Sequence, residues 1–91
     1  MPTYVVERYL PAGTSAALRT QGRRATEAAA ALTVEGIPVA FLGVAYIHHD
    51  ETCFLLFEGE SIEAVANANR RAGLPFDRVS EAVYVAAEDV S

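Results

Sequence analysis

The sequence predicts an α+β fold in which two helices cover one face of a four-stranded antiparallel sheet. Three observations lead to this prediction. Four short segments are rich in β-branched and aromatic residues, and two alanine-rich segments separate them in the order strand, helix, strand, strand, helix, strand. No linker, repeat or low-complexity tract interrupts the chain, so we expect one domain over residues 1–91.

The first strand and the first helix lie at the start of the chain. Thr3 to Tyr9 (TYVVERY) has the composition of a strand, and the turn-forming segment Leu10 to Gly13 follows it. Thr14 or Ser15 stands where it would cap the next, alanine- and arginine-rich segment, and Gly36 stands where it would end it. Because the apolar residues between these caps recur at steps of three and four, we expect a helix there.

The middle of the chain predicts a hairpin. Val39 to Ile47 (VAFLGVAYI) and Thr52 to Phe57 (TCFLLF) are almost wholly apolar, and histidines and carboxylates separate them. Two such runs joined by a short polar segment are typical of paired antiparallel strands.

The last third of the chain predicts a second helix and a fourth strand. Ser61 as N-cap and Gly73 as terminator delimit the helix, and Arg78 to Ala87 (RVSEAVYVAA) forms the strand. The resulting order β-α-β-β-α-β is that of the ferredoxin-like sandwich. Its sheet has the strand order 4-1-3-2, and all neighbours are antiparallel.

The apolar content points to a covered sheet face. Hydrophobic residues make up 52% of the chain, more than a small monomer needs. The second and third strands do not alternate apolar and polar residues, as a strand with one solvent-facing side does. Two helices cover only one face, so we expect the other to pack on a second copy, in a homodimer resembling an α+β barrel that buries about 800 Å² per partner.

Charge and targeting features argue against several kinds of partner. The net charge is −5, and the seven basic residues, all arginine, form no basic stripe, which argues against nucleic acid. No apolar run reaches the ~18–20 residues of a membrane span, and the opening MPTYVVERYL lacks the pattern of a signal peptide. One cysteine permits no intrachain disulfide, and we expect a soluble protein in a reducing, cytoplasmic setting.

The expected topology gathers polar residues at one end of the sheet, where the first two strands end and the last two begin. The residues expected there are Glu7, Arg8, Tyr9, His48, His49, Thr52, Cys53, Arg78, Ser80 and Glu81. The start of the first helix should lie at the same end. Any site of this domain is therefore expected at that end.

The stretch YIHHDETCF holds both histidines of the chain. Adjacent strand residues point to opposite faces. His48 and His49 therefore bind one metal ion only if the turn reorients one of them, or if each takes another partner such as Asp50, Glu51 or a second copy. Imidazole nitrogen with carboxylate oxygen suits nickel, zinc or copper. The alternative interpretation is a solvated hairpin tip.

A second hypothesis is acid–base chemistry on a small apolar molecule in a cavity at the dimer sheet. The candidate catalytic residues are Glu7, Tyr46 and Glu81, and the candidate substrate-binding residues are Arg8 and Tyr84. The simpler interpretation of these charges is ion pairing across the sheet, of Arg8 with Glu81 or of Glu7 with Arg78.

Three stretches, TYVVERYLP, YIHHDETCF and RRAGLPFDRVSEAVYV, resemble a family of small bacterial proteins whose best-described type is a nickel-binding, ferredoxin-like dimer. The resemblance spans about Met1 to Val85 and implies a ferredoxin-like homodimer with nickel as its metal. Tyr46, Asp50 and Cys53 match the family's hairpin pattern, whereas His48 and His49 do not. The family's second helix often carries a histidine just before its Ala-Arg-Arg-Ala-Gly end, where this chain has Ala68-Asn69.

The leading hypothesis is a small dimeric protein that holds a divalent transition metal, nickel-like, through His48, His49 and nearby carboxylates such as Asp50. The alternative is a small-molecule enzyme of the cyclase, isomerase or cofactor-free oxygenase type. A pure interaction module is the third hypothesis.

Overall fold

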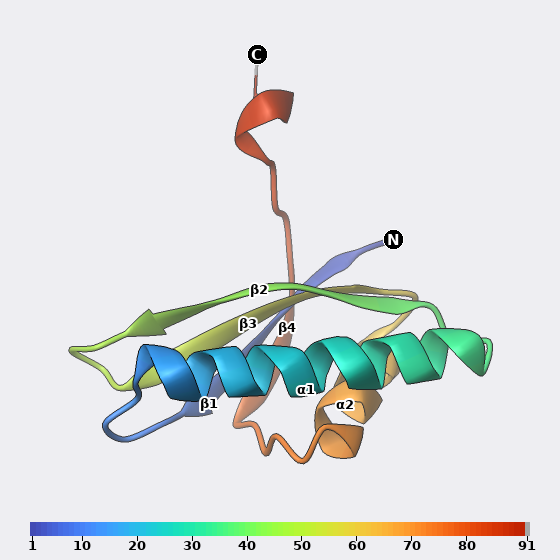
Figure 1. Ribbon diagram of the computed structural model, residues 1–91. Helices are drawn as coiled ribbons and strands as arrows, with labels where there is room; N and C mark the ends of the chain where they lie inside the picture. Colours follow the sequence, from blue (N-terminus) through green and yellow to red (C-terminus); the bar gives the residue numbers. More distant parts are fainter. Residues whose placement is uncertain (91) are drawn as a thin grey trace.

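The computed structural model describes residues 1–90 and has the predicted order of elements (Figure 1). The strands are β1 (Thr3–Tyr9), β2 (Val39–Ile47), β3 (Thr52–Gly59) and β4 (Arg78–Ala82), and the helices are α1 (Ser15–Val34), α2 (Ile62–Arg71) and a short 3-10 turn, η1 (Ala87–Asp89). The sheet order is β2-β3-β1-β4 with antiparallel neighbours, which confirms the predicted ferredoxin-like α+β fold. Neither helix among the described residues is long and apolar enough to cross a membrane.

Side-chain caps fix where the two helices begin. Thr14, one of the two expected caps, accepts a hydrogen bond from the Ala17 N–H at 3.1 Å, and Ser61 accepts one from the Ala64 N–H at 3.1 Å. Both bonds satisfy an amide that has no partner within the first turn. Gly73, with φ of +71°, reverses the chain after α2 as predicted.

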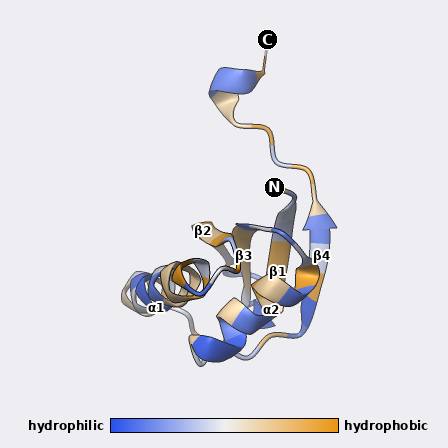
Figure 2. Cartoon of the chain, turned by 90° about the vertical axis from the view of Figure 1, so that its right-hand side faces the viewer, coloured by the Kyte–Doolittle hydropathy of each residue, from blue (hydrophilic) through white to orange (hydrophobic). Residues whose placement is uncertain are grey.

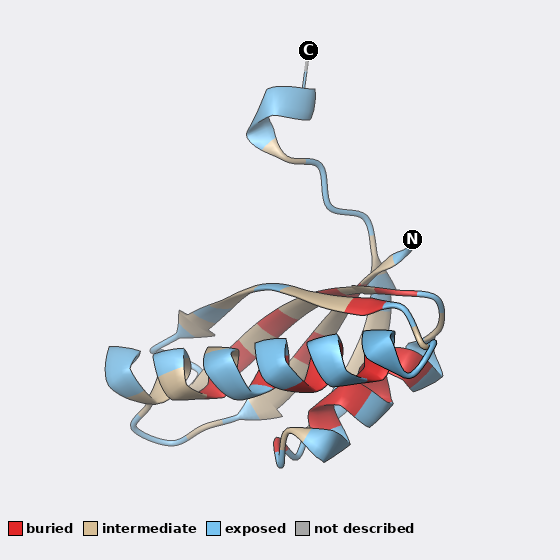
Figure 3. Cartoon of the chain, turned by 45° about the vertical axis from the view of Figure 1, so that its right-hand side comes forward, coloured by how far each residue is buried: buried red, intermediate tan, exposed pale blue. Residues whose placement is uncertain are grey.

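Both helices lie on one side of the sheet (Figure 2), and the core fills the space between the two layers (Figure 3). Val6 on β1 faces Leu55 on β3 and Val79 on β4 in the sheet register, and Val6 and Leu55 have no exposed surface. The helices contribute mainly small residues, such as Ala25 and Val65, so they approach the sheet closely.

The opposite face of the sheet carries a second apolar set, which confirms the lack of alternation seen in the sequence. Val5 on β1 has Leu56 of β3 as its neighbour, and Ala45 on β2 has Phe54. Nothing in the described chain covers this face with a helix (Figure 2). We call it the open face.

The fourth strand is shorter than predicted. The sequence predicted a strand to Ala87, whereas the ladder of β4 with β1 ends at the pair Thr3–Ala82. The ladder ends where β1 begins, because Thr3 is the first residue of β1 and is the partner of Ala82. Residues 83–86 thus have strand composition without a strand partner.

Candidate metal-binding site

The predicted polar end of the sheet exists. Glu7 of β1 lies opposite Arg78 of β4, and Tyr9 lies opposite Thr52, which in turn lies opposite Ile47 of β2. The ends of β1 and β2 therefore adjoin the starts of β3 and β4, and the loop that leads into α1 begins there as well.

The histidines occupy the tight turn that joins β2 to β3. His48, His49 and Asp50 are exposed, and all three lie in the turn rather than in a strand. The imidazole of His48 meets the ring of Tyr46 edge-on, with ring centroids 5.0 Å apart and an interplanar angle of 85°. The Thr52 hydroxyl donates to the carbonyl of Asp50 at 3.0 Å and fixes the turn. Both imidazoles are thus presented to solvent within a defined turn.

This turn does not gather a complete ligand set in one chain. Within residues 1–90, no three side chains of histidine, cysteine, aspartate or glutamate converge on one point. His48 and His49 are neighbours in the turn, and Asp50 follows them, so the donors are close in sequence but spread over the turn. The side chains of this turn alone therefore do not form a closed metal site within one chain.

Glu51 closes the turn and has a structural part. Its carboxylate accepts the Ala12 N–H at 2.6 Å and the Tyr9 hydroxyl at 3.4 Å, while its carbonyl accepts the Leu10 N–H at 2.7 Å. These bonds tie the hairpin to the loop between β1 and α1. Glu51 was expected as an optional metal partner, and the structure uses it for this attachment.

Tyr46 holds the same loop from the other side. Its hydroxyl donates to the carbonyl of Leu10 at 2.6 Å and accepts the Gly13 N–H at 3.0 Å. A Cβ at Gly13 would lie 2.7 Å from Tyr46 Cζ, so the close approach of loop and ring requires glycine. Because both hydrogen bonds go to the backbone of this loop, the Tyr46 hydroxyl holds the loop in place.

Glu7 pairs with Arg78, as the simpler interpretation of its charge predicted. Its Oε2 accepts a hydrogen bond from Arg78 Nε at 2.6 Å, and this bond raises the pKa of the Arg78 guanidinium. The next carboxylate, Asp77, accepts the Tyr9 N–H at 2.8 Å and was missed from the sequence. Residue type gave no signal for this bond, because aspartate in a turn usually bonds an amide nearby in the chain, whereas Tyr9 lies on a different strand.

Arg8 lies on the helix-covered face beside Cys53, its neighbour in the register. Its Nε and Nη1 are buried and have no hydrogen-bond partner among the described residues. Burial raises the pKa of the Cys53 thiol, and the charge of Arg8 partly offsets the rise. The alternative pair, Arg8 with Glu81, is not formed, because Glu81 lies opposite Tyr4.

The five residues proposed for acid–base chemistry are not brought together. Arg8 and Tyr46 lie on the helix-covered face, and Glu7 lies on the open face. Glu81 is exposed, about 10 Å along β4 from Arg78 at the rise of an extended strand. Tyr84 lies beyond the end of β4. The expectation that Glu81 joins Glu7 at the polar end is wrong, because it sits three residues further along the strand.

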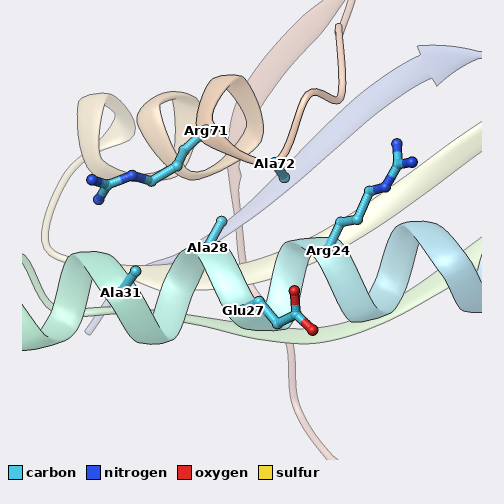
Figure 4. A pocket seen from close by; sticks show the side chains of 6 residues that line it. All are labelled: Arg24, Glu27, Ala28, Ala31, Arg71 and Ala72. Atoms are coloured by element: carbon cyan, nitrogen blue, oxygen red, sulfur yellow. The ribbon is translucent and has the colours of Figure 1, made fainter.

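Two grooves on the surface lie away from the hairpin. One, of about 370 Å³, lies between α1 and α2 over Ala28, Ala31 and Ala72 (Figure 4). Arg24 and Arg71 at its rim extend in different directions, and Arg71 pairs with Glu35 at 2.6 Å, so the two guanidinium groups do not converge on one anion. The other, of about 320 Å³, lies on the open face and is lined by apolar side chains of β1, β2 and β3 together with Tyr84.

The fold and this site define a small ferredoxin-like α+β domain with an exposed histidine-containing hairpin at the polar end of its sheet. The family model described as nickel responsive protein SCO4226-like matches residues 4–82, and the chain belongs to this family. The crystal structure of SCO4226 from Streptomyces coelicolor A3(2) superimposes with a TM-score of 0.69 at 26% sequence identity, covering 92% of this chain and 99% of that one. No curated protein matches the chain.

Proposed function

We propose that this chain is a small dimeric protein that binds a divalent transition metal ion, with nickel as the first candidate, through His48 and His49 and with Asp50 as a further donor. The observation that carries the proposal is the turn itself, which exposes two imidazoles and a carboxylate in three consecutive residues. Imidazole is a suitable ligand for nickel, zinc and copper. The family description, nickel responsive protein, favours nickel among these metals.

The proposal includes a requirement for ligands from outside one chain. Nickel in nitrogen and oxygen sites takes at least four ligands, and one turn offers two imidazoles and one carboxylate that do not converge. Water or the hairpin of a second copy supplies the rest. Binding is therefore expected to be weaker than at a closed, four-ligand protein site, and to depend on protein concentration if the second copy takes part.

The enzymatic hypothesis has less support. The apolar groove on the open face is the place for a small apolar substrate, but the described residues that line it include no carboxylate. Glu7, one of the two carboxylates named as candidate catalytic residues, is engaged with Arg78. An acid–base role would need this pair to separate.

Calorimetric titration of untagged protein with NiCl₂ tests the proposal. We expect a binding isotherm for the wild type and none for the His48→Ala/His49→Ala variant. Glu63→Gln, which neutralises an exposed carboxylate on α2 away from the hairpin, is the matched control and should bind as the wild type does. Thermal melts of all three proteins show that the variants are folded.

Residue-level evidence comes from amide NMR spectra recorded with substoichiometric Ni²⁺. Paramagnetic broadening should begin at residues 47–51 and spread outwards from the turn. Uniform weak broadening, or broadening centred on the carboxylates of η1, would overturn the assignment to the hairpin. Absence of heat in the wild type at micromolar protein would overturn metal binding by this turn.

A further inference from the structure

The charges of this chain are unevenly divided between its helices and the rest of the molecule. Helices α1 and α2 contain five of the seven arginines and two of the twelve acidic residues, so together they carry a net charge of +3. The remaining two arginines and ten acidic residues carry −8, which gives the total of −5. The helix layer is therefore the basic side of an acidic protein. Its arginines are Arg19, Arg23, Arg24, Arg70 and Arg71.

The groove of about 370 Å³ lies between these two helices (Figure 4). We call it the interhelix groove. Its floor consists of alanine side chains, Ala28 and Ala31 from α1 and Ala72 from the end of α2. Because these side chains end at Cβ, the main chain of another molecule can approach both helices closely. The groove lies on the opposite side of the sheet from the open face and away from the hairpin, so it is a separate surface.

Two arginines mark the two ends of the interhelix groove (Figure 4). Arg24 makes no ion pair within residues 1–90, whereas Arg71 bonds Glu35 at 2.6 Å. Both partners of that pair are nearly half exposed, and an exposed pair of this kind is weak enough for another carboxylate to displace. Glu35 follows Arg24 by eleven residues, so the two guanidinium groups are anchored about 16 Å apart along α1. One anion cannot bridge this distance, but two carboxylates on one chain can.

We propose that the interhelix groove binds a short, extended, acidic segment of a partner protein. One carboxylate of the segment bonds Arg24, a second bonds Arg71 in place of Glu35, and small apolar side chains between them lie on the alanine floor. About five residues of extended chain span the 16 Å between the two anchoring points. A helix of that length and about 10 Å across would fill about 1,200 Å³, several times the volume of the groove. The volume therefore favours an extended occupant.

The distribution of charge favours a protein segment over a nucleic acid or an anionic membrane. Glu27, Glu35 and Glu63 are exposed on the same two helices or at their ends, and they would repel a continuous negative surface. The apolar side chains of the groove are alanines, which offer little area for insertion into lipid. A peptide carries its charges at discrete points, so its carboxylates can meet the two arginines and avoid these glutamates.

Fluorescence anisotropy of a labelled peptide, Glu-Glu-Ala-Leu-Ala-Glu-Glu, tests the proposal. Its paired glutamates offer carboxylates four to six residues apart. The untagged full chain is titrated into the peptide in EDTA, so that metal binding by the hairpin plays no part. We expect saturable binding, and none for the peptide in which glutamine replaces all four glutamates. Because the net charge of −5 repels an acidic peptide at long range, saturable binding reports a local site. An anisotropy that does not saturate by about 1 mM protein overturns the proposal.

Three variants at exposed positions test whether the peptide lies in the groove. Arg24→Gln removes one anchoring charge and should weaken binding by about 3-fold. Glu35→Gln removes the carboxylate that competes for Arg71 and should strengthen binding by about 3-fold. Ala31→Leu fills the floor without changing any charge and should weaken binding by at least about 10-fold. Arg19→Gln is the matched control, because it makes the same charge change on α1 about 140° around the helix from Arg24, and it should bind as the wild type does.

The same measurements can contradict the proposal in three ways. Equal weakening by Arg24→Gln and Arg19→Gln would mean that binding follows the overall charge of the helices and not the groove. Wild-type affinity in Ala31→Leu would mean that the peptide binds elsewhere. Co-sedimentation of the wild type, but not of Arg24→Gln, with vesicles of phosphatidylcholine and phosphatidylserine would identify a lipid surface as the partner and overturn the assignment to a protein segment. Thermal melts show whether each variant is folded.

Discussion

Ala12 and Glu51 both have a positive φ, of 52° and 49°, and the N–H of Ala12 donates to the Glu51 carboxylate at 2.6 Å. Each of these left-handed residues costs about 1–2 kcal/mol relative to a right-handed conformation. This hydrogen bond joins the two left-handed residues, one in the loop after β1 and one in the turn after β2. The turn that carries His49 and Asp50 is therefore held by a contact with the loop between β1 and α1.

Replacing Glu51 by alanine should loosen this attachment. The variant keeps the left-handed residue but removes a charged acceptor for the Ala12 N–H, so we expect a loss of about 1.5–3 kcal/mol in the free energy of unfolding. Urea titration measures it. Glu60→Gln, at an exposed carboxylate between β3 and α2, should change the free energy by less than about 0.5 kcal/mol. An equal change in both variants would mean that the Ala12–Glu51 bond contributes nothing.

The sequence was sufficient for the elements whose signals are local. The caps Thr14 and Ser61 and the terminator Gly73 each act within one turn of chain, so their positions follow from residue type. The apolar runs of β2 and β3 also located their strands. The pair Glu7–Arg78 followed once the sheet order was known, because antiparallel neighbours at one end of a sheet meet in register.

The register of neighbouring strands and the length of β4 could not be predicted from the sequence. Glu81 and Glu7 are both polar residues of adjoining strands, but three residues of register separate them, and composition does not fix register. Residues 83–86 have strand propensity, but a strand needs a partner, and β1 begins too late to provide one. The hydrogen bonds of Glu51 and Asp77 depend on left-handed or turn backbone that residue type alone did not indicate.

Gly13 and Gly22 should respond to alanine with opposite signs. At Gly13 the added Cβ meets Tyr46 at 2.7 Å, so we expect a loss of about 1–3 kcal/mol as ring and loop move apart. At Gly22, inside α1, the nearest atom would be 3.4 Å away, an ordinary contact, and alanine should gain about 0.5–1 kcal/mol through helix propensity. Thermal melts of both variants measure these changes in stability. A more stable Gly13→Ala variant would contradict the close packing of Tyr46 on this loop.

Cys53 predicts a pH dependence of stability with a definite sign. Burial raises the pKa of its thiol, so the folded state favours the protonated form. This contribution is fully present below the unfolded pKa of about 8.5 and is lost as the pH rises through the higher folded value. Between about pH 8 and 10 the free energy of unfolding should fall more steeply for the wild type than for Cys53→Ala. Parallel curves for the two proteins would exclude a raised thiol pKa.

The order of metal affinities tests whether the hairpin is an open site. Two exposed imidazoles and a carboxylate impose no geometry of their own, so binding should follow the general series, with copper tighter than nickel and nickel tighter than cobalt and manganese. Competition calorimetry measures the order. Nickel binding tighter than copper would instead require a rigid site built from more than one hairpin.

Arg8 should be replaceable without loss of stability. Its Nε and Nη1 are buried without partners among the described residues, and each unsatisfied buried donor costs about 1–3 kcal/mol. Arg8→Met keeps the apolar stem and removes the donors, so we expect the free energy of unfolding to rise by about 1 kcal/mol. Arg19→Met, at an exposed position of α1, should change it by less than about 0.5 kcal/mol.

A second readout of Arg8→Met separates a gain in packing from the loss of a charge. Because the charge of Arg8 lowers the pKa of the Cys53 thiol, its removal should raise that pKa further and slow the reaction of the thiol with a disulfide reagent. A loss of stability together with an unchanged thiol would show that the guanidinium has a bound partner, such as an anion, and would return Arg8 to the list of ligand-binding residues.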